Sequence, residues 1–189
     1  DISITTVMDA LSHSFESIWN KNANPTSTDF AISAICSILE HGPKLKDDPS
    51  NLKIRNELLK ASTVAGLAFS NTTTAAAHSI SYPLTIHYGI PHGVASSISL
   101  IPLLEINGNL IKEPLERICN NNGLTREELL DTIRSIPQGV IPYTLDEWGV
   151  PEDQLQKLAD ESFTKGRMDN NIVDLSRNDV KSILKKVLN

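Results

Sequence analysis

The chain has 189 residues, of which 40% are hydrophobic and 21% are charged. This composition is typical of a globular unit that buries a substantial core, and it excludes wholesale disorder. Seventeen basic against 23 acidic residues give a net charge of −6 with no long basic run, which argues against a nucleic-acid-binding protein.

Helical periodicity dominates the first part of the chain. Apolar residues recur every three or four positions over residues 4–19, which predicts a helix with one buried face. Asn24 followed by Pro25 is a helix start signal, because asparagine caps a helix and proline fits its first position. We expect this second helix to end at Gly42-Pro43.

A third helix is predicted over residues 50–69, followed by an alanine-rich helical segment over 72–88. Pro83 lies inside that segment, and we expect it to kink or break the helix. A further apolar helix is predicted over 94–106. The later helices are predicted over 109–121, 125–135, 152–163 and 178–188. Because no convincing β alternation occurs, the predicted fold class is all-α, a helical bundle.

The two cysteines, Cys36 and Cys119, are far apart and form no CxxC motif. They exclude a disulfide framework and a thiolate metal site, and they fit a reducing, cytoplasmic location. No apolar stretch approaches the ~20 residues of a membrane-spanning helix, so no membrane partner is expected. Because the sequence opens on Asp1 and enters a helical pattern almost at once, we expect it to begin inside a longer protein.

Four side chains form a candidate metal site. Asp9 and His13 are four residues apart, so on a helix they share one face about 6 Å apart. His78 lies in a run of small apolar residues, and His92 lies at a predicted helix start. Taken singly, Asp9 and His13 fit a polar helix face on the surface, His78 fits a buried core histidine, and His92 fits a solvated helix end. Together, one carboxylate and three imidazoles suit zinc or ferrous iron.

These residues lie in short motifs that occur together. The motifs are MDALSH at 8–13, GLAFSN at 66–71, HSISYPL at 78–84, IPHGVA at 90–95 and RMDNN at 167–171. In this combination the sequence resembles the iron-dependent (group III) alcohol dehydrogenase family over nearly all of its length. One difference is Ile172, which stands where the family usually has proline after the last motif.

The resemblance implies a dehydroquinate synthase-like α domain, residues 1–189, from an enzyme whose N-terminal domain binds NAD(P). That domain is expected to be absent here, because the nine glycines contain no GxGxxG and not one GxG. The resemblance also implies that Asp9, His13, His78 and His92 ligate Fe(II) or Zn(II). The metal then acts as a Lewis acid that polarises the oxygen of a small alcohol or aldehyde for hydride transfer. Such enzymes are commonly homodimers or larger.

Tyr82 departs from the family pattern. Many members have a histidine four residues after the first histidine of the signature, often assigned to proton relay or substrate contact. Tyr82 occupies that position here, so a catalytic role for it is expected as a hydrogen-bond donor, since a free tyrosine pKa near 10 makes a poor proton shuttle. Residues 72–74 and 81–85 resemble the branch that includes phosphonoacetaldehyde reductases, whose substrates carry an oxyanion.

Two other functions stay open. One is a related metalloenzyme, such as a dehydroquinate synthase or glycerol dehydrogenase, which uses this domain with three protein ligands, so that loss of His13 would leave metal affinity nearly intact. The other is a non-catalytic helical interaction domain, which zinc or iron would not stabilise. Under the favoured interpretation, the isolated domain binds metal weakly or not at all and shows no dehydrogenase turnover.

Overall fold

The structure, a computed structural model, describes residues 2–189. Ten α-helices and three 3-10 helices account for the regular structure of this part of the chain. The helices are α1 (Ile2–Ile18), α2 (Pro25–Leu45), α3 (Leu52–Thr72), α4 (Ala76–Tyr88), α5 (His92–Ser97), α6 (Leu100–Asn107), α7 (Lys112–Asn122), α8 (Arg126–Ser135), η1 (Asp146–Trp148), η2 (Glu152–Gln154), α9 (Leu155–Glu161), η3 (Met168–Asn170) and α10 (Arg177–Lys186). Within residues 2–189 the only β pairing is an isolated bridge between Asn20 and Asn171, so the predicted all-α class is confirmed.

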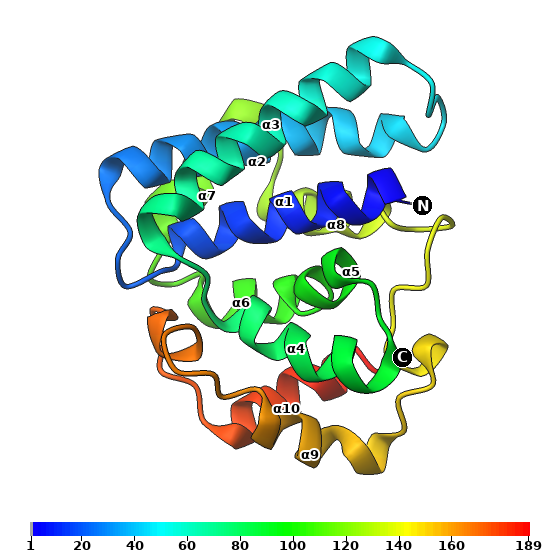
Figure 1. Ribbon diagram of the computed structural model, residues 1–189. Coiled ribbons are helices and arrows are strands. Elements are labelled where there is room, and N and C mark those ends of the chain that lie inside the picture. Colours follow the sequence, from blue (N-terminus) through cyan, green and yellow to red (C-terminus); the bar gives the residue numbers. More distant parts are fainter. Residues whose placement is uncertain (1) are drawn as a thin grey trace.

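Helix α1 occupies the middle of the molecule. Figure 1 shows it between the long α2–α3 hairpin on one side and α4 and α5 on the other, with α9 and α10 beyond α4. Its apolar stripe is fully buried, and the rings of Phe15 and Trp19 stack with centroids 5.6 Å apart. Because α1 packs against neighbours on both sides, several of its polar side chains are buried or half-buried, and three of them, Asp9, His13 and Glu16, lie at the candidate site.

Helix α2 begins where the sequence predicts but ends later. Asn24 accepts a hydrogen bond from the backbone N–H of Ser27 and completes a capping box, with Pro25 at the first helical position. The predicted stop at Gly42-Pro43 is wrong, because the helix continues to Leu45. Proline removes one backbone hydrogen bond, but burial of Leu45 in the core holds the last turn in place.

The segment from His78 to His92 also differs from the prediction. Helix α4 passes through Pro83 without a break, and Pro83 is itself buried. The chain reverses instead at Gly89, which caps α4 in the left-handed conformation with φ of 66°. The single helix predicted over 94–106 is two helices, α5 and α6, separated at residues 98–99.

Gly93 allows α5 to pack directly on α1. A Cβ atom at this position would lie 1.9 Å from the carbonyl oxygen of Thr5 and 3.2 Å from the Cβ of Asp9. Only glycine permits such a close approach of two backbones. The crossing therefore brings the start of α5, with His92, against the turn of α1 that carries Asp9.

No single helix among the described residues is long and apolar enough to cross a membrane. One bent pair, His92–Asn107 with Lys112–Asn122, meets the requirements of length and composition together, with 119° between its parts. Within this pair, Leu100, Leu103 and Ile118 are buried in the protein core.

Candidate metal centre

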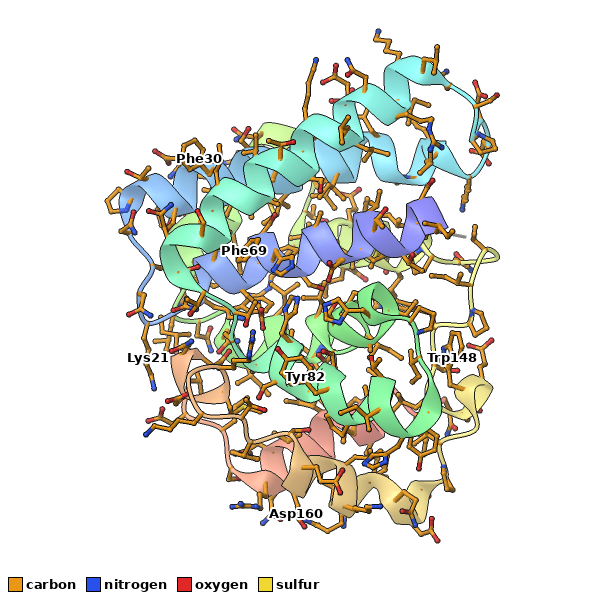
Figure 2. All side chains as sticks on the ribbon, viewed as in Figure 1. Lys21, Phe30, Phe69, Tyr82, Trp148 and Asp160 are labelled. Carbon is orange, nitrogen blue, oxygen red and sulfur yellow. The ribbon has the colours of Figure 1, made fainter. Side chains whose placement is uncertain are left out.

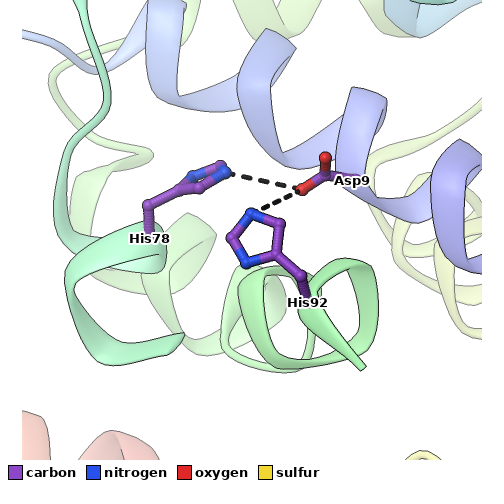
Figure 3. Close-up of side chains that lie close together, drawn as sticks. All are labelled: Asp9, His78 and His92. Atoms are coloured by element: carbon purple, nitrogen blue, oxygen red, sulfur yellow. Dashed lines mark ion pairs between the residues drawn. The ribbon is translucent and has the colours of Figure 1, made fainter. Parts of the chain in front are cut away.

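Three of the four predicted ligands converge. One ligand atom from each of Asp9, His78 and His92 lies within 4.8 Å of the others. Figure 3 shows both imidazole rings directed at the carboxylate, with Nε2 of His78 and Nε2 of His92 each 3.5 Å from Oδ1 of Asp9. The residues come from α1, α4 and α5, so the fold gathers groups that are distant in sequence.

His13 lies beside this cluster. Its ring stacks between Phe69 of α3 and His78, with centroid distances of 4.2 Å to each. Its Nε2 lies 3.6 Å from the second carboxylate oxygen of Asp9, as the four-residue spacing on α1 predicts. Its ligand atoms do not join the group formed by Asp9, His78 and His92.

Two further side chains hold the cluster in place. Glu16, two turns after Asp9 on α1, is fully buried, and its Oε2 lies 2.6 Å from Nδ1 of His78. Its Oε1 accepts a hydrogen bond from the backbone N–H of His78 at 3.1 Å. The hydroxyl of Ser96, on α5, donates to Oδ1 of Asp9 at 2.9 Å. The carboxylate and the His78 ring are therefore both fixed by neighbours.

The charges of the cluster are strongly coupled. Burial acts to raise the pKa of Asp9, but the imidazoles of His13 and His78 outweigh it and hold that pKa well below its usual range. Burial opposes protonation of His78, but the negative charges of Glu16 and Asp9 raise its pKa to about 9. The pKa of His92 is lowered by burial and by the positive charges around it, despite Asp9.

Tyr82 lies one turn after His78 on α4 (Figure 2), and its side chain is half-buried. The guanidinium of Arg167 lies over its ring, 5.2 Å from the centroid, and donates a hydrogen bond to the hydroxyl of Thr74 at 2.6 Å. Burial raises the pKa of Tyr82 above its ordinary value, although the positive charge of Arg167 opposes the shift. The hydroxyl is therefore protonated at neutral pH.

Two buried atoms of the predicted ligands lack a hydrogen-bond partner, Nδ1 of His13 and Nε2 of His78. Nε2 of His78 is within ion-pair distance of Asp9 but makes no hydrogen bond. A buried polar atom without a partner is unfavourable unless another group satisfies it. With a carboxylate and a second imidazole beside it, this nitrogen faces a donor set that suits a divalent cation.

A wide hollow lies away from these residues. It has a volume of about 980 Å³ and lies between the start of α1, the end of α2 and the start of α3. Its lining is mainly apolar and includes the exposed side chains of Leu52 and Leu59. None of the predicted ligands lines it, so this hollow is not part of the candidate metal site.

Sequence reasoning missed Glu16 and Ser96. Glu16 follows Asp9 by seven residues, which on a helix places both carboxylates on one face. An acidic residue between Phe15 and the apolar end of the helix was the signal that could have identified it. Ser96 carries no such signal, because it is one of three serines within residues 96–99 and nothing local distinguishes it from the others.

Comparison with known proteins identifies the family. The sequence model described as the C-terminal part of the iron-containing alcohol dehydrogenase family matches residues 3–188. The chain is 29% identical to an NAD-dependent methanol dehydrogenase of Bacillus methanolicus, over 99% of this chain and 52% of that protein. It is 30% identical to an NADPH-dependent butanol dehydrogenase of Clostridium saccharobutylicum, over 82% of this chain and 42% of that protein.

Solved structures agree with this assignment. A 1,3-propanediol oxidoreductase superposes with a TM-score of 0.84 at 28% identity, over 97% of this chain and 51% of that one. A sulfoacetaldehyde reductase from Bifidobacterium kashiwanohense, in complex with NAD+, gives 0.86 at 26% identity, over 98% and 50%. The chain thus spans about half the length of the proteins it matches. It belongs to the iron-containing alcohol dehydrogenase family and corresponds to the all-α, C-terminal part of that family.

Proposed function

We propose that this chain is the metal-binding domain of an NAD(P)-dependent alcohol dehydrogenase or aldehyde reductase. Asp9, His13, His78 and His92 are the proposed ligands of Fe(II) or Zn(II). The observation that carries the proposal is the convergence of a carboxylate and two imidazoles from three helices, in a chain that belongs to a family of iron-containing alcohol dehydrogenases.

The residues fit such a cation. Imidazole nitrogen and carboxylate oxygen are ligands that both Fe(II) and Zn(II) accept, so the donor set does not choose between them. The pKa of Asp9 lies well below its usual range, so the carboxylate is charged at any pH near neutral. The unpartnered Nε2 of His78 gains a partner when a cation takes the place of its proton.

When bound, the cation supplies the Lewis acidity that polarises the substrate oxygen for hydride transfer to or from the nicotinamide. The chain's own residues determine the side from which the substrate reaches the cation. His78 is buried on one side of the cluster, with 3% of its side chain exposed, whereas His92 is 48% exposed. A small alcohol or aldehyde is therefore expected to enter from the side of His92, and the packing around His78 keeps water from the opposite side.

Tyr82 is the proposed contact to the substrate within this chain. It follows His78 by one helical turn, so both residues lie on the same face of α4. Because burial raises its pKa, the phenol keeps its proton at neutral pH and can donate a hydrogen bond but not relay a proton. Arg167, stacked over the ring, fixes the orientation of the side chain.

The nicotinamide is assigned to residues outside this sequence. The relatives are about twice as long as this chain, and two of them are named for their use of NAD or NADPH. A Gly-rich phosphate-binding turn is missing from the 189 residues. We therefore expect the isolated chain to show no dehydrogenase turnover.

One observation favours a three-ligand version of the site. The ligand atoms of His13 do not join those of Asp9, His78 and His92. Three protein ligands are what the resemblance implies for dehydroquinate synthase-like and glycerol dehydrogenase-like enzymes. The role of His13 therefore separates two metalloenzymes built on the same domain.

The test combines zinc binding with turnover. Because three ligands converge within this chain alone, we expect the isolated chain to bind zinc weakly rather than not at all. The purified chain is heated with and without millimolar zinc, and we expect zinc to raise the apparent melting temperature of the wild type but not of Asp9→Asn. The same chain, supplied with NAD and a primary alcohol, is expected to be inactive. Robust NAD-dependent turnover would overturn the division between two domains, and no stabilisation by zinc would favour a helical interaction domain.

A further inference from the structure

Glu16 is the only buried Asp or Glu among residues 2–189, with no exposed surface. A buried carboxylate is unfavourable unless its oxygens are paired. Both oxygens of Glu16 are paired, and their partners lie at one place: the ring and the backbone N–H of His78, together with the backbone of Ala75. This carboxylate from α1 thus caps the first turn of α4.

The contact is directional. Oε2 of Glu16 lies 2.6 Å from Nδ1 of His78, while Oε1 accepts from the His78 backbone N–H at 3.1 Å. A charged carboxylate has no proton to donate, so Nδ1 must carry the hydrogen of this bond. Glu16 therefore holds the His78 ring at Nδ1, and this leaves Nε2 facing Asp9 and His92.

We propose that Glu16 is a positioning residue that keeps the proton on Nδ1 of His78 and so commits Nε2 to the metal. The inference rests on the proposed function. Carboxylates that orient metal-binding imidazoles in this way typically change metal affinity 10–100-fold when they are replaced. Glu16 touches neither the substrate nor the cation, so it acts through His78 alone.

The alternative is that Glu16 only stabilises the fold, because it also caps the start of α4. Glu16→Gln separates the two roles. Its amide oxygen can replace Oε1 as acceptor for the backbone N–H groups, which leaves the NH₂ group facing the ring. Nδ1 must then accept, so the imidazole proton moves to Nε2, where it blocks metal binding.

A matched control lies on the same helix. His87, near the end of α4, pairs with Glu161 of α9 through Nε2, and the two side chains are 36% and 39% exposed. Glu161→Gln changes the same kind of contact without reaching the cluster. Zinc alone is the probe, titrated into the metal-free 189-residue chain up to millimolar concentration because weak binding is expected.

We expect the zinc dissociation constant to rise 10–100-fold in Glu16→Gln and to stay unchanged in Glu161→Gln. Imidazole ¹⁵N NMR of the zinc-loaded wild type gives a direct readout that needs no variant, with the proton expected on Nδ1 of His78 and zinc on Nε2. Zinc on Nδ1 would overturn the inference, as would unchanged affinity in a folded Glu16→Gln.

The metal site and the role of Glu16 can be disproved separately. If the wild type binds zinc and Asp9→Asn does not, the proposed metal site stands whatever Glu16 does. If Glu16→Gln does not fold, the ¹⁵N assignment in the wild type still decides the role of Glu16. If the wild type binds no zinc at all, both the metal site and this inference are wrong.

Discussion

The two ends of helix α4 carry the same pair of groups in different surroundings. Near its start, His78 contacts Glu16, and both side chains are buried. Near its end, His87 contacts Glu161, and both are more than one third exposed. The distances between the paired atoms are nearly equal, 2.6 Å and 2.5 Å.

Burial makes these two ion pairs behave differently. Around His87, water screens both charges and can replace either partner, so such a pair contributes little. Around His78, no water competes, and the backbone of α4 shares the carboxylate. The buried pair therefore fixes one ring orientation, which a metal ligand requires, whereas the surface pair leaves its ring free to change partners.

Removing the acidic partner should give the largest contrast. Glu16→Ala leaves His78 and a backbone N–H unpaired inside the protein, and breaking a buried pair in this way typically costs about 3–5 kcal/mol of folding free energy. Glu161→Ala should cost at most about 1 kcal/mol. Urea denaturation of both variants at pH 7 measures the two values, and equal losses would contradict the comparison.

The stability of the metal-free protein should depend on pH through the same residues. The pKa of His78 rises from 6.5 to about 9 on folding, so its contribution is complete below pH 6.5 and is lost as the pH rises through 9. The loss amounts to about 3 kcal/mol, since one pKa unit is worth about 1.4 kcal/mol. His92, whose pKa is lowered, acts in the opposite direction.

Glu16 makes the stability of the protein depend on pH in the acidic range. Its pKa is lowered on folding, because the charge of His78 outweighs burial, so its contribution is present above pH 4.5 and is lost as the pH falls. Urea denaturation in EDTA from pH 4 to 9 should show a decline at each end. A wild-type curve that is flat from pH 6.5 to 9 would show that the buried pair is not charged.

Replacing His13 of α1, which stacks on His78, and His87 at the far end of α4 tests the number of ligands. With zinc at 100 times its dissociation constant, the wild type should gain about 2.7 kcal/mol of stability. His13→Ala should lose most of that gain if four residues bind the metal, whereas His87→Ala should keep it. Retention of the full gain by His13→Ala would favour the three-ligand enzymes. Thermal melts with and without zinc give the rise in melting temperature of each variant. Because each variant is compared with itself, any change in its stability without zinc cancels.

Two glycines beyond α4 give the smallest expected effects on stability. Gly93→Ala places a methyl group against the Thr5 carbonyl, and overpacking of this kind typically costs about 1–3 kcal/mol. Gly89→Ala meets no neighbour and strains only the left-handed backbone, at about 1 kcal/mol. Zinc binding separates them, because only Gly93→Ala moves His92 away from Asp9. Equal zinc affinity in both variants would show that the α1–α5 crossing does not position the ligand.

The sequence predicted the helices better than their ends. Asn24-Pro25 gave the start of α2 correctly, because capping is decided by neighbouring residues. Pro43 and Pro83 did not end their helices, because burial of the surrounding turns outweighs the loss of one hydrogen bond, and burial depends on distant residues. The reversal between His78 and His92 was expected at Pro83 but occurs at Gly89.

The candidate site was predicted in part for the same reason. Asp9 and His13 follow from helical spacing, and family motifs supplied His78 and His92. The partners that hold them, Glu16 and Ser96, became visible only when α1, α4 and α5 were packed together. The stacking of His13 between Phe69 and His78 likewise depends on a third helix, α3.

The ligands come from distant parts of the chain, so unfolding separates them. In an unfolded chain only Asp9 and His13 stay close, and one carboxylate with one imidazole is a weak chelator. A cation that contacts Asp9 and His92 together closes a long loop, and this becomes possible only after α5 has docked on α1. Zinc should therefore discriminate sharply between folded and unfolded molecules, and its release would report the separation of the first helix from the middle of the chain.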